Sequence, residues 1–186
     1  MERITLSLTR KQVASLSVGN RRLLSGVVYT ARDAAHKRLI ALLDAGERLP
    51  FDMEDACIYY TGPTPAPPGR VIGAVGPTTS GRMDVYTPRL LEAGLRVMIG
   101  KGERGDAVAS AMQKTGAIYL GALGGIGALL SSCVKESQVI AFPDLGTEAI
   151  RRLVVQDFPV TVVIDSNGDN LYKIGRRDFL AWKTRI

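Results

Sequence analysis

Three consecutive hydroxyl residues and an arginine occur together in the segment Gly76–Asp84, whose sequence is GPTTSGRMD. The segment follows the apolar run Val71–Val75, which we expect to be a buried strand. Open α/β sheets bind ligands beyond the carboxyl ends of their strands. Arginine holds a carboxylate in two-point geometry and hydroxyls add further donors, so this segment could bind a carboxylate. The alternative is a structural loop in which Arg82 pairs with Asp84.

A second candidate is the turn Gly100-Lys101-Gly102, which follows the expected strand Leu95–Ile99. Two glycines allow the backbone to pass close to a ligand, and the lysine supplies a point charge. A single lysine in a turn is more often only solvated. Because consecutive strands of such a sheet would end at one edge, we expect Lys101 to lie near Arg82.

A third candidate is the sequence RDAAH, residues 32–36, at the start of an expected helix. Arg32 is unfavourable there because the amino end of a helix carries partial positive charge. An anion bound at this end would offset the repulsion; alternatively, Asp33 neutralises it. His36 could support the site from behind or simply lie on the helix surface.

The glycine-rich segment Gly121–Gly127 invites a dinucleotide interpretation, but its spacing does not match G-x-G-x-x-G. A phosphate-binding GxxxxGK[ST] loop is also absent from the sequence. Close backbone packing is the better interpretation of these glycines.

The composition indicates one globular domain over residues 1–186, with 46% hydrophobic and 23% charged residues. The two cysteines, Cys57 and Cys133, are far apart, and His36 is the single histidine. A four-iron cluster needs three or four thiolates, so this chain cannot ligate one alone. We therefore expect no metal ligands in this chain, and no disulfide in a reducing compartment.

The formal net charge of +6 raises the question of nucleic-acid binding. The basic residues are scattered as doublets and aromatic residues for base stacking are few, so we expect no nucleic-acid partner. A solvated surface and an anionic small substrate remain as explanations of the charge.

The most apolar stretch, Ala117–Leu130, is shorter than the roughly 20 residues of a membrane span. With no apolar leader at the amino end, we expect a cytoplasmic protein without membrane contact.

Strands alternate with helices from about residue 56 to 142, which predicts an α/β fold with a largely parallel sheet flanked by helices. The expected strands are Glu2–Leu8, Leu23–Tyr29, Cys57–Tyr60, Val71–Val75, Leu95–Ile99, Ala117–Gly121 and Gln138–Phe142, with a final hairpin of Val160–Asp165 and Leu171–Lys173. The expected helices begin at the caps Thr9, Thr30 and Thr87 and span Asp106–Thr115 and Gly127–Val134.

The stretch YTGPTPAPPGRVIGAVGPTTSGRMDVYTPRLLEAGLRVMIGKG, residues 60–102, resembles the C-terminal, or β, region of class I fumarases and L-tartrate dehydratases. RDAAH upstream and TEAIRRLVVQDFPVTVVIDSNGDNLY downstream resemble the same family in order and spacing. The resemblance implies a swivelling β/β/α domain. It also implies a four-iron–four-sulfur cluster on a separate α chain or an N-terminal domain, with the active site between the two parts. We expect a separate α subunit, and therefore a hetero-oligomer.

The family's functional residues in this region fall on Arg32, Thr78, Thr79, Arg82 and Lys101, all of which keep the family's residue type. The resemblance implies reversible hydration of fumarate to (S)-malate, with catalytic roles for Thr78 as the base and for Lys101. Arg32, Thr79, Arg82 and Lys101 would bind the dicarboxylate substrate. The alternatives are the β subunit of an L-tartrate dehydratase, which converts tartrate to oxaloacetate, and a non-catalytic anion-binding module.

Overall fold

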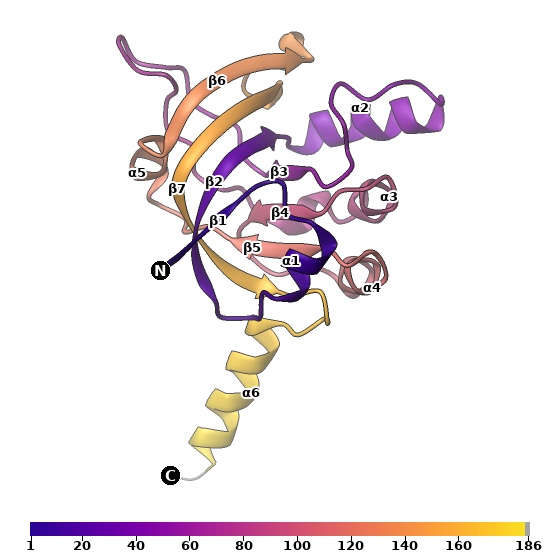
Figure 1. Cartoon of the computed structure of the whole chain (residues 1–186), viewed down its shortest axis with the longest axis vertical. Helices are drawn as coiled ribbons and strands as arrows, with labels where there is room; N and C mark the ends of the chain where they lie inside the picture. The colour runs from indigo at the N-terminus through magenta and orange to yellow at the C-terminus, as the bar shows by residue number, and fades with distance from the viewer. Residues whose placement is uncertain (185–186) are drawn as a thin grey trace.

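The computed structural model describes residues 1–184 and contains a seven-stranded mixed sheet with helices on its outside (Figure 1). The strands are β1 (Glu2–Thr5), β2 (Arg21–Thr30), β3 (Cys57–Tyr59), β4 (Val97–Gly100), β5 (Ile118–Gly121), β6 (Val134–Ala141) and β7 (Ile150–Ile164). The helices are α1 (Arg10–Ala14), α2 (Asp33–Asp44), α3 (Thr87–Glu92), α4 (Asp106–Thr115), α5 (Gly127–Ser131) and α6 (Leu171–Lys183), with the 3-10 helices η1 (Ser80–Met83) and η2 (Pro143–Glu148).

The sheet closes on itself because β7 pairs with strands on both sides. Neighbours from β1 to β5 are parallel, whereas β7 runs antiparallel to β2, β5 and β6. Its register places Phe158 opposite Leu24 of β2 and Val162 opposite Leu120 of β5. The mixed α/β class is therefore as expected, but the largely parallel sheet is not confirmed, since one long antiparallel strand completes the closure.

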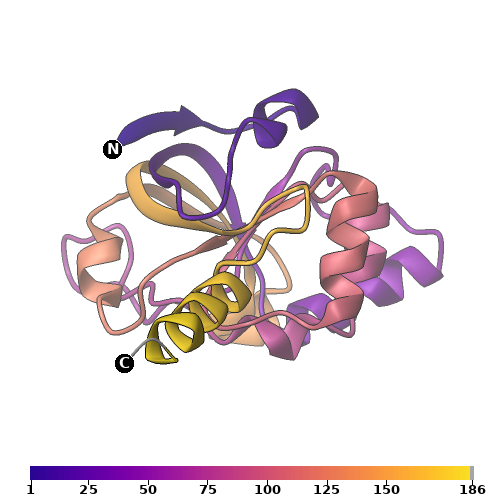
Figure 2. The ribbon, with the colours of Figure 1, turned by 90° about the horizontal axis from the view of Figure 1, so that it is seen from below.

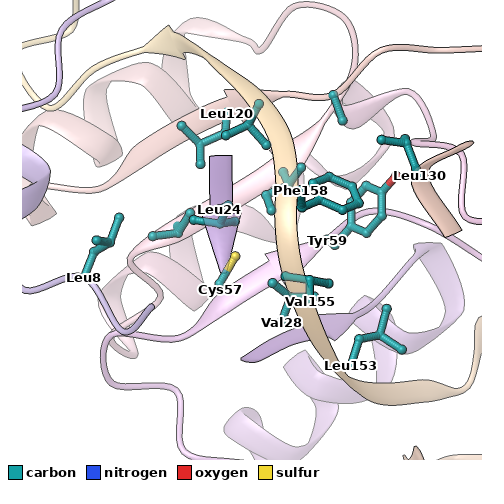
Figure 3. Close-up of a cluster of buried hydrophobic side chains, with 14 of the residues drawn as sticks. Leu8, Leu24, Val28, Cys57, Tyr59, Leu120, Leu130, Leu153, Val155 and Phe158 are labelled. Carbon is teal, nitrogen blue, oxygen red and sulfur yellow. The ribbon is translucent and has the colours of Figure 1, made fainter. Parts of the chain in front are cut away.

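Both faces of β3 and β4 are buried, which explains why these strands are apolar throughout. Successive side chains of a strand point to opposite faces. Cys57 and Tyr59 lie in an inner cluster with Phe158, enclosed by the curved strands (Figure 3). Ile58 lies in an outer cluster with Leu39 of α2, between the sheet and the helices.

Helices α2, α3 and α4 lie on one side of the sheet (Figure 2). The predicted helix Asp106–Thr115 is confirmed with the same bounds, and Gly116 ends it with φ 71° in the left-handed region. The predicted capping box at Thr9 and Gln12 is also confirmed.

Two expected strands are wrong. The segment 71–75 forms no strand: Val71 is half exposed, and the Val75 N–H donates to the Gly127 carbonyl rather than to a neighbouring strand. Leu171–Lys173 is the first turn of α6, because the Asn170 side chain accepts from the Tyr172 N–H and caps a helix.

The start of α2 also differs from the expectation that Thr30 caps it. The Thr30 hydroxyl accepts from the Arg151 N–H at 3.0 Å and donates to the Ala149 carbonyl at 3.3 Å, so it joins β2 to β7. The N-cap position of α2 is therefore Arg32.

Helix α6 projects away from the sheet (Figure 1). No helix within residues 1–184 has both the length and the apolar character needed to cross a bilayer.

Candidate functional site

The Thr78–Ser80 backbone lies beside the Lys101 turn at the carboxyl ends of β3 and β4. The Thr78 N–H donates to the Tyr60 carbonyl at 2.7 Å, and the Lys101 N–H donates to the Thr78 carbonyl at 3.3 Å. The Ser80 N–H donates in turn to the Lys101 carbonyl at 2.9 Å. These bonds form an isolated parallel bridge between Thr79 and Lys101, so two of the predicted site segments are direct neighbours.

Arg82 joins this segment to the start of α2. Its Nε lies 2.9 Å from Asp33 Oδ1 and its Nη2 lies 2.9 Å from Asp33 Oδ2. The alternative pairing of Arg82 with Asp84 is wrong, because Asp84 pairs with Arg104. Asp33 also suits the first turn of a helix, where a carboxylate complements the positive end of the dipole.

Arg32 is held by a carboxylate from a distant part of the chain. Its Nη2 lies 3.5 Å from Glu148 Oε1, and Glu148 Oε2 accepts from the Ala34 N–H at 2.9 Å. The alternative in which Asp33 neutralises Arg32 is not observed, since Asp33 pairs with Arg82. A Cβ at Gly62 would lie 2.8 Å from Arg32 Nη1, so a side chain at this position would displace the guanidinium group.

Lys101 is exposed, and within residues 1–184 no carboxylate lies within ion-pair distance of it. It lines a cavity of about 480 Å³ together with Arg21, Thr161 and Tyr172, and the other four predicted site residues do not line this cavity. A Cβ at Gly124 would lie 3.6 Å from Lys101 Nζ, so the glycine-rich segment passes directly beside the ammonium group.

The same glycine-rich segment packs against backbone, as its composition predicted. A Cβ at Gly127 would lie 2.7 Å from the Gly76 backbone nitrogen. The glycine-rich segment therefore lies directly beside the start of the Gly76–Asp84 loop.

His36 is buried rather than lying on the surface of α2. Its Nδ1 lies 2.9 Å from the Arg32 carbonyl oxygen, and burial is the main cause that lowers the pKa of His36 to about 4. The ring is therefore neutral near pH 7, with Nδ1–H donating to Arg32. His36 therefore holds the backbone carbonyl of Arg32, a candidate site residue, from the buried side of α2.

Sequence reasoning missed two buried or half-buried charged residues at this site, Glu148 and Arg104. The Arg104 side chain is fully buried and bonds Asp84 at 2.7 Å and the Thr87 hydroxyl at 2.8 Å. No local pattern identifies either residue, because each meets its partners only in the folded chain.

The cysteines of this chain do not fit the ligation of an iron–sulfur cluster. Cys57 lies in the inner core (Figure 3), and burial raises the pKa of its thiol, so the thiolate that a cluster needs is disfavoured. The pKa of Cys133 is also raised, chiefly by burial. Within residues 1–184, no group of three or more Cys, His, Asp or Glu side chains could hold a metal ion.

Comparison with known proteins places the chain beside one family. The family model described as "Fumarase C-terminus" matches residues 1–175. The chain is 40% identical over 165 residues to Fumarate hydratase 2 of Leishmania major, covering 88% of this chain and 29% of the relative. It is 40% identical over 164 residues to the anaerobic class I fumarate hydratase of Escherichia coli strain K12, covering 87% and 30%.

A third relative has a different length. The chain is 38% identical over 179 residues to a putative L(+)-tartrate dehydratase subunit beta of Methanocaldococcus jannaschii, covering 93% of this chain and 92% of the relative. The chain thus spans about 30% of the fumarate hydratases that it matches, but nearly all of this subunit.

Proposed function

Because the chain belongs to the fumarase C-terminus family, we propose that it is the β subunit of a two-subunit iron–sulfur hydro-lyase that hydrates fumarate reversibly to (S)-malate. An α subunit carries the four-iron–four-sulfur cluster, and the active site forms between the two chains. The curved sheet with helices on one side then serves as the swivelling domain of the family. One observation carries the proposal: the five predicted site residues lie on three segments that hydrogen bonds and an ion pair hold together.

The division into two subunits has independent support. The chain is 38% identical to a relative that is itself named a putative L(+)-tartrate dehydratase subunit beta, and the match covers 92% of that relative. The two cysteines are buried or half-buried with raised thiol pKa values, which supports the proposal that the cluster's ligands lie outside these 186 residues.

Three cations from this chain hold the two carboxylates of the substrate. Arg82 uses Nε and Nη2 on Asp33, which leaves its Nη1 edge to face a substrate carboxylate. Arg32 and Lys101 contribute the other positive charges. Together they stabilise the negative charge that develops on the carboxylate when the proton leaves the adjacent carbon.

Thr78 takes this proton, and Thr79 donates a hydrogen bond to the substrate. A threonine hydroxyl is a weak base, so its deprotonated form needs positive charge nearby. Lys101 is the candidate we favour, because its backbone pairs directly with the Thr78–Ser80 segment.

A second candidate function is the dehydration of L-tartrate to oxaloacetate, in the same subunit role. The nearly full-length match to a putative tartrate dehydratase subunit beta favours it. Tartrate carries one more hydroxyl than malate, so its site needs an additional polar partner, which the α chain would supply.

Co-expression with the α chain and a turnover assay test the proposal. We expect a brown, oxygen-sensitive complex that converts fumarate to malate, and a colourless, inactive preparation of this chain alone. Turnover of tartrate without turnover of fumarate would select the second candidate. A brown and active preparation of this chain by itself would contradict the subunit assignment.

A further inference from the structure

We propose that Tyr119 is a positioning residue whose buried hydroxyl holds the Thr78–Ser80 segment and the Lys101 turn in a fixed relation. The proposal rests on the proposed function for its kinetic consequence. Its structural part stands on contacts within this chain.

The Tyr119 hydroxyl contacts both segments at once. It lies 3.0 Å from the Gly102 carbonyl, to which it donates, and 2.8 Å from Ser80 Oγ, which can donate back to it. Ser80 directly follows Thr79, and Gly102 directly follows Lys101. One side chain of β5 thus joins the neighbours of two candidate site residues.

The packing around Ser80 shows that these hydrogen bonds lie in the buried core. Ser80 and Tyr119 are both fully buried. A Cβ at Gly100 would lie 2.0 Å from Ser80 Oγ and 2.9 Å from Tyr60 Cδ2, so the absence of a side chain at Gly100 makes room for the serine. A buried hydroxyl without a partner is destabilising, and here each hydroxyl satisfies the other.

The buried guanidinium of Arg104 supports Tyr119 from one side. Its Cζ lies 5.2 Å from the ring centroids of both Tyr119 and Tyr60, and its Nη1 lies 3.3 Å from the Tyr60 hydroxyl. Burial raises the pKa of the Tyr119 phenol, so the group stays protonated and can donate to Gly102. A phenylalanine would fill the same space but could not tie the two segments together.

Hydrogen exchange on the full chain tests the structural part. Tyr119→Phe should make the amides of Ser80 and Lys101, which pair across the two segments, exchange about tenfold faster. The matched control is Tyr59→Phe, which removes a buried hydroxyl that donates to the Val75 carbonyl on the other face of the sheet. It should lower the melting temperature similarly while leaving these two amides unchanged.

Steady-state kinetics of the complex with the α chain test the functional part. Tyr119→Phe should lower kcat by about tenfold to a hundredfold with a smaller rise in KM, because Thr78, which acts in the proton transfer, is displaced together with Lys101, which also binds the substrate. Ser80→Ala should have a smaller effect in the same direction. Adding it to Tyr119→Phe should lower kcat little further, since both changes remove the same link.

A purely structural role would lower the melting temperature of Tyr119→Phe and leave kcat per folded complex unchanged, which would overturn the proposal. Unchanged exchange of Ser80 and Lys101 would overturn it as well. If the wild-type complex converts neither fumarate nor tartrate, the proposed function fails. The exchange measurement on this chain still decides whether Tyr119 joins the two segments.

Discussion

At the scale of single residues, the ion pairs determine which charges are available to a ligand. Arg82 pairs with Asp33 and Arg32 pairs with Glu148, so two of the three candidate cations are partly neutralised within the chain. Within the described part of the chain, no carboxylate pairs with Lys101. Its side chain is exposed to solvent, and its ammonium group lies beside Gly124. We therefore expect Lys101 to contribute most of the uncompensated positive charge.

Under the proposed function, replacing Lys101 with alanine should lower kcat/KM for fumarate in the complex by about thirtyfold to several hundredfold. The loss of one charge-assisted contact in a site that excludes water corresponds to roughly 2–4 kcal/mol. The melting temperature should change little, because the side chain is exposed. Lys114→Ala, in the last turn of α4, is the matched control and should keep full activity. Equal activity of the two variants would remove Lys101 from the site.

At the scale of elements, the start of α2 depends on η2, more than a hundred residues further along the chain. Arg32 occupies the N-cap position and makes no side-chain capping bond, so the cap comes from elsewhere. Glu148 provides it by accepting from the Ala34 N–H while it pairs with Arg32. The helix that carries one candidate site residue is therefore anchored by a second element.

Replacing Glu148 with alanine should lower the free energy of unfolding by about 1–2 kcal/mol, because a helix cap and an ion pair are lost together. It should also raise KM, since Arg32 loses the group that orients it. Chemical denaturation measures the first effect. The control Glu136→Ala removes a more exposed carboxylate that lies 3.7 Å from Arg152. It should change stability by less than about 1 kcal/mol, and an equal loss in both variants would contradict the capping role.

At the scale of the whole molecule, two apolar clusters share the sheet, and His36 lies buried on the side of the helices. Its pKa is lowered to about 4, mainly by burial, against about 6.5 in the unfolded chain. Below pH 6.5 the unfolded chain therefore binds a proton that the folded chain excludes, so stability falls as the pH falls from 6.5 towards 4. His36 is the single histidine of the sequence, which isolates this effect.

Between pH 7.5 and pH 5 we expect the free energy of unfolding to decrease by about 2 kcal/mol because of His36. Urea denaturation at the two pH values measures the difference. His36→Gln, which retains an amide donor for the Arg32 carbonyl but does not titrate, should lose most of this dependence. The same decrease in wild type and variant would show that His36 is not the group responsible.

Local patterns were sufficient to predict several elements. The capping box at Thr9, the helix Asp106–Thr115 and the apolar strand at Cys57 were all predicted from residues close together in the sequence. Each depends on interactions within one or two turns or on alternation along a strand, so neighbouring residues carry the information. Residue types at the ends of expected strands and at a helix start indicated the three site segments, and the resemblance to a family then identified the five residues within them, whose roles are proposals.

The tertiary structure decided the strand order, the closure of the sheet and the partner of each charge. The segment Ile150–Ile164 contains Pro159 and several polar residues, so its sequence does not indicate the longest strand, which runs antiparallel to three others. Asp33 could have paired with its neighbour Arg32, yet it pairs with Arg82, while Glu148 takes Arg32. Ion pairs and buried hydrogen bonds depend on distance in space. Sequence spacing cannot determine such distances once residues are separated by whole strands and helices.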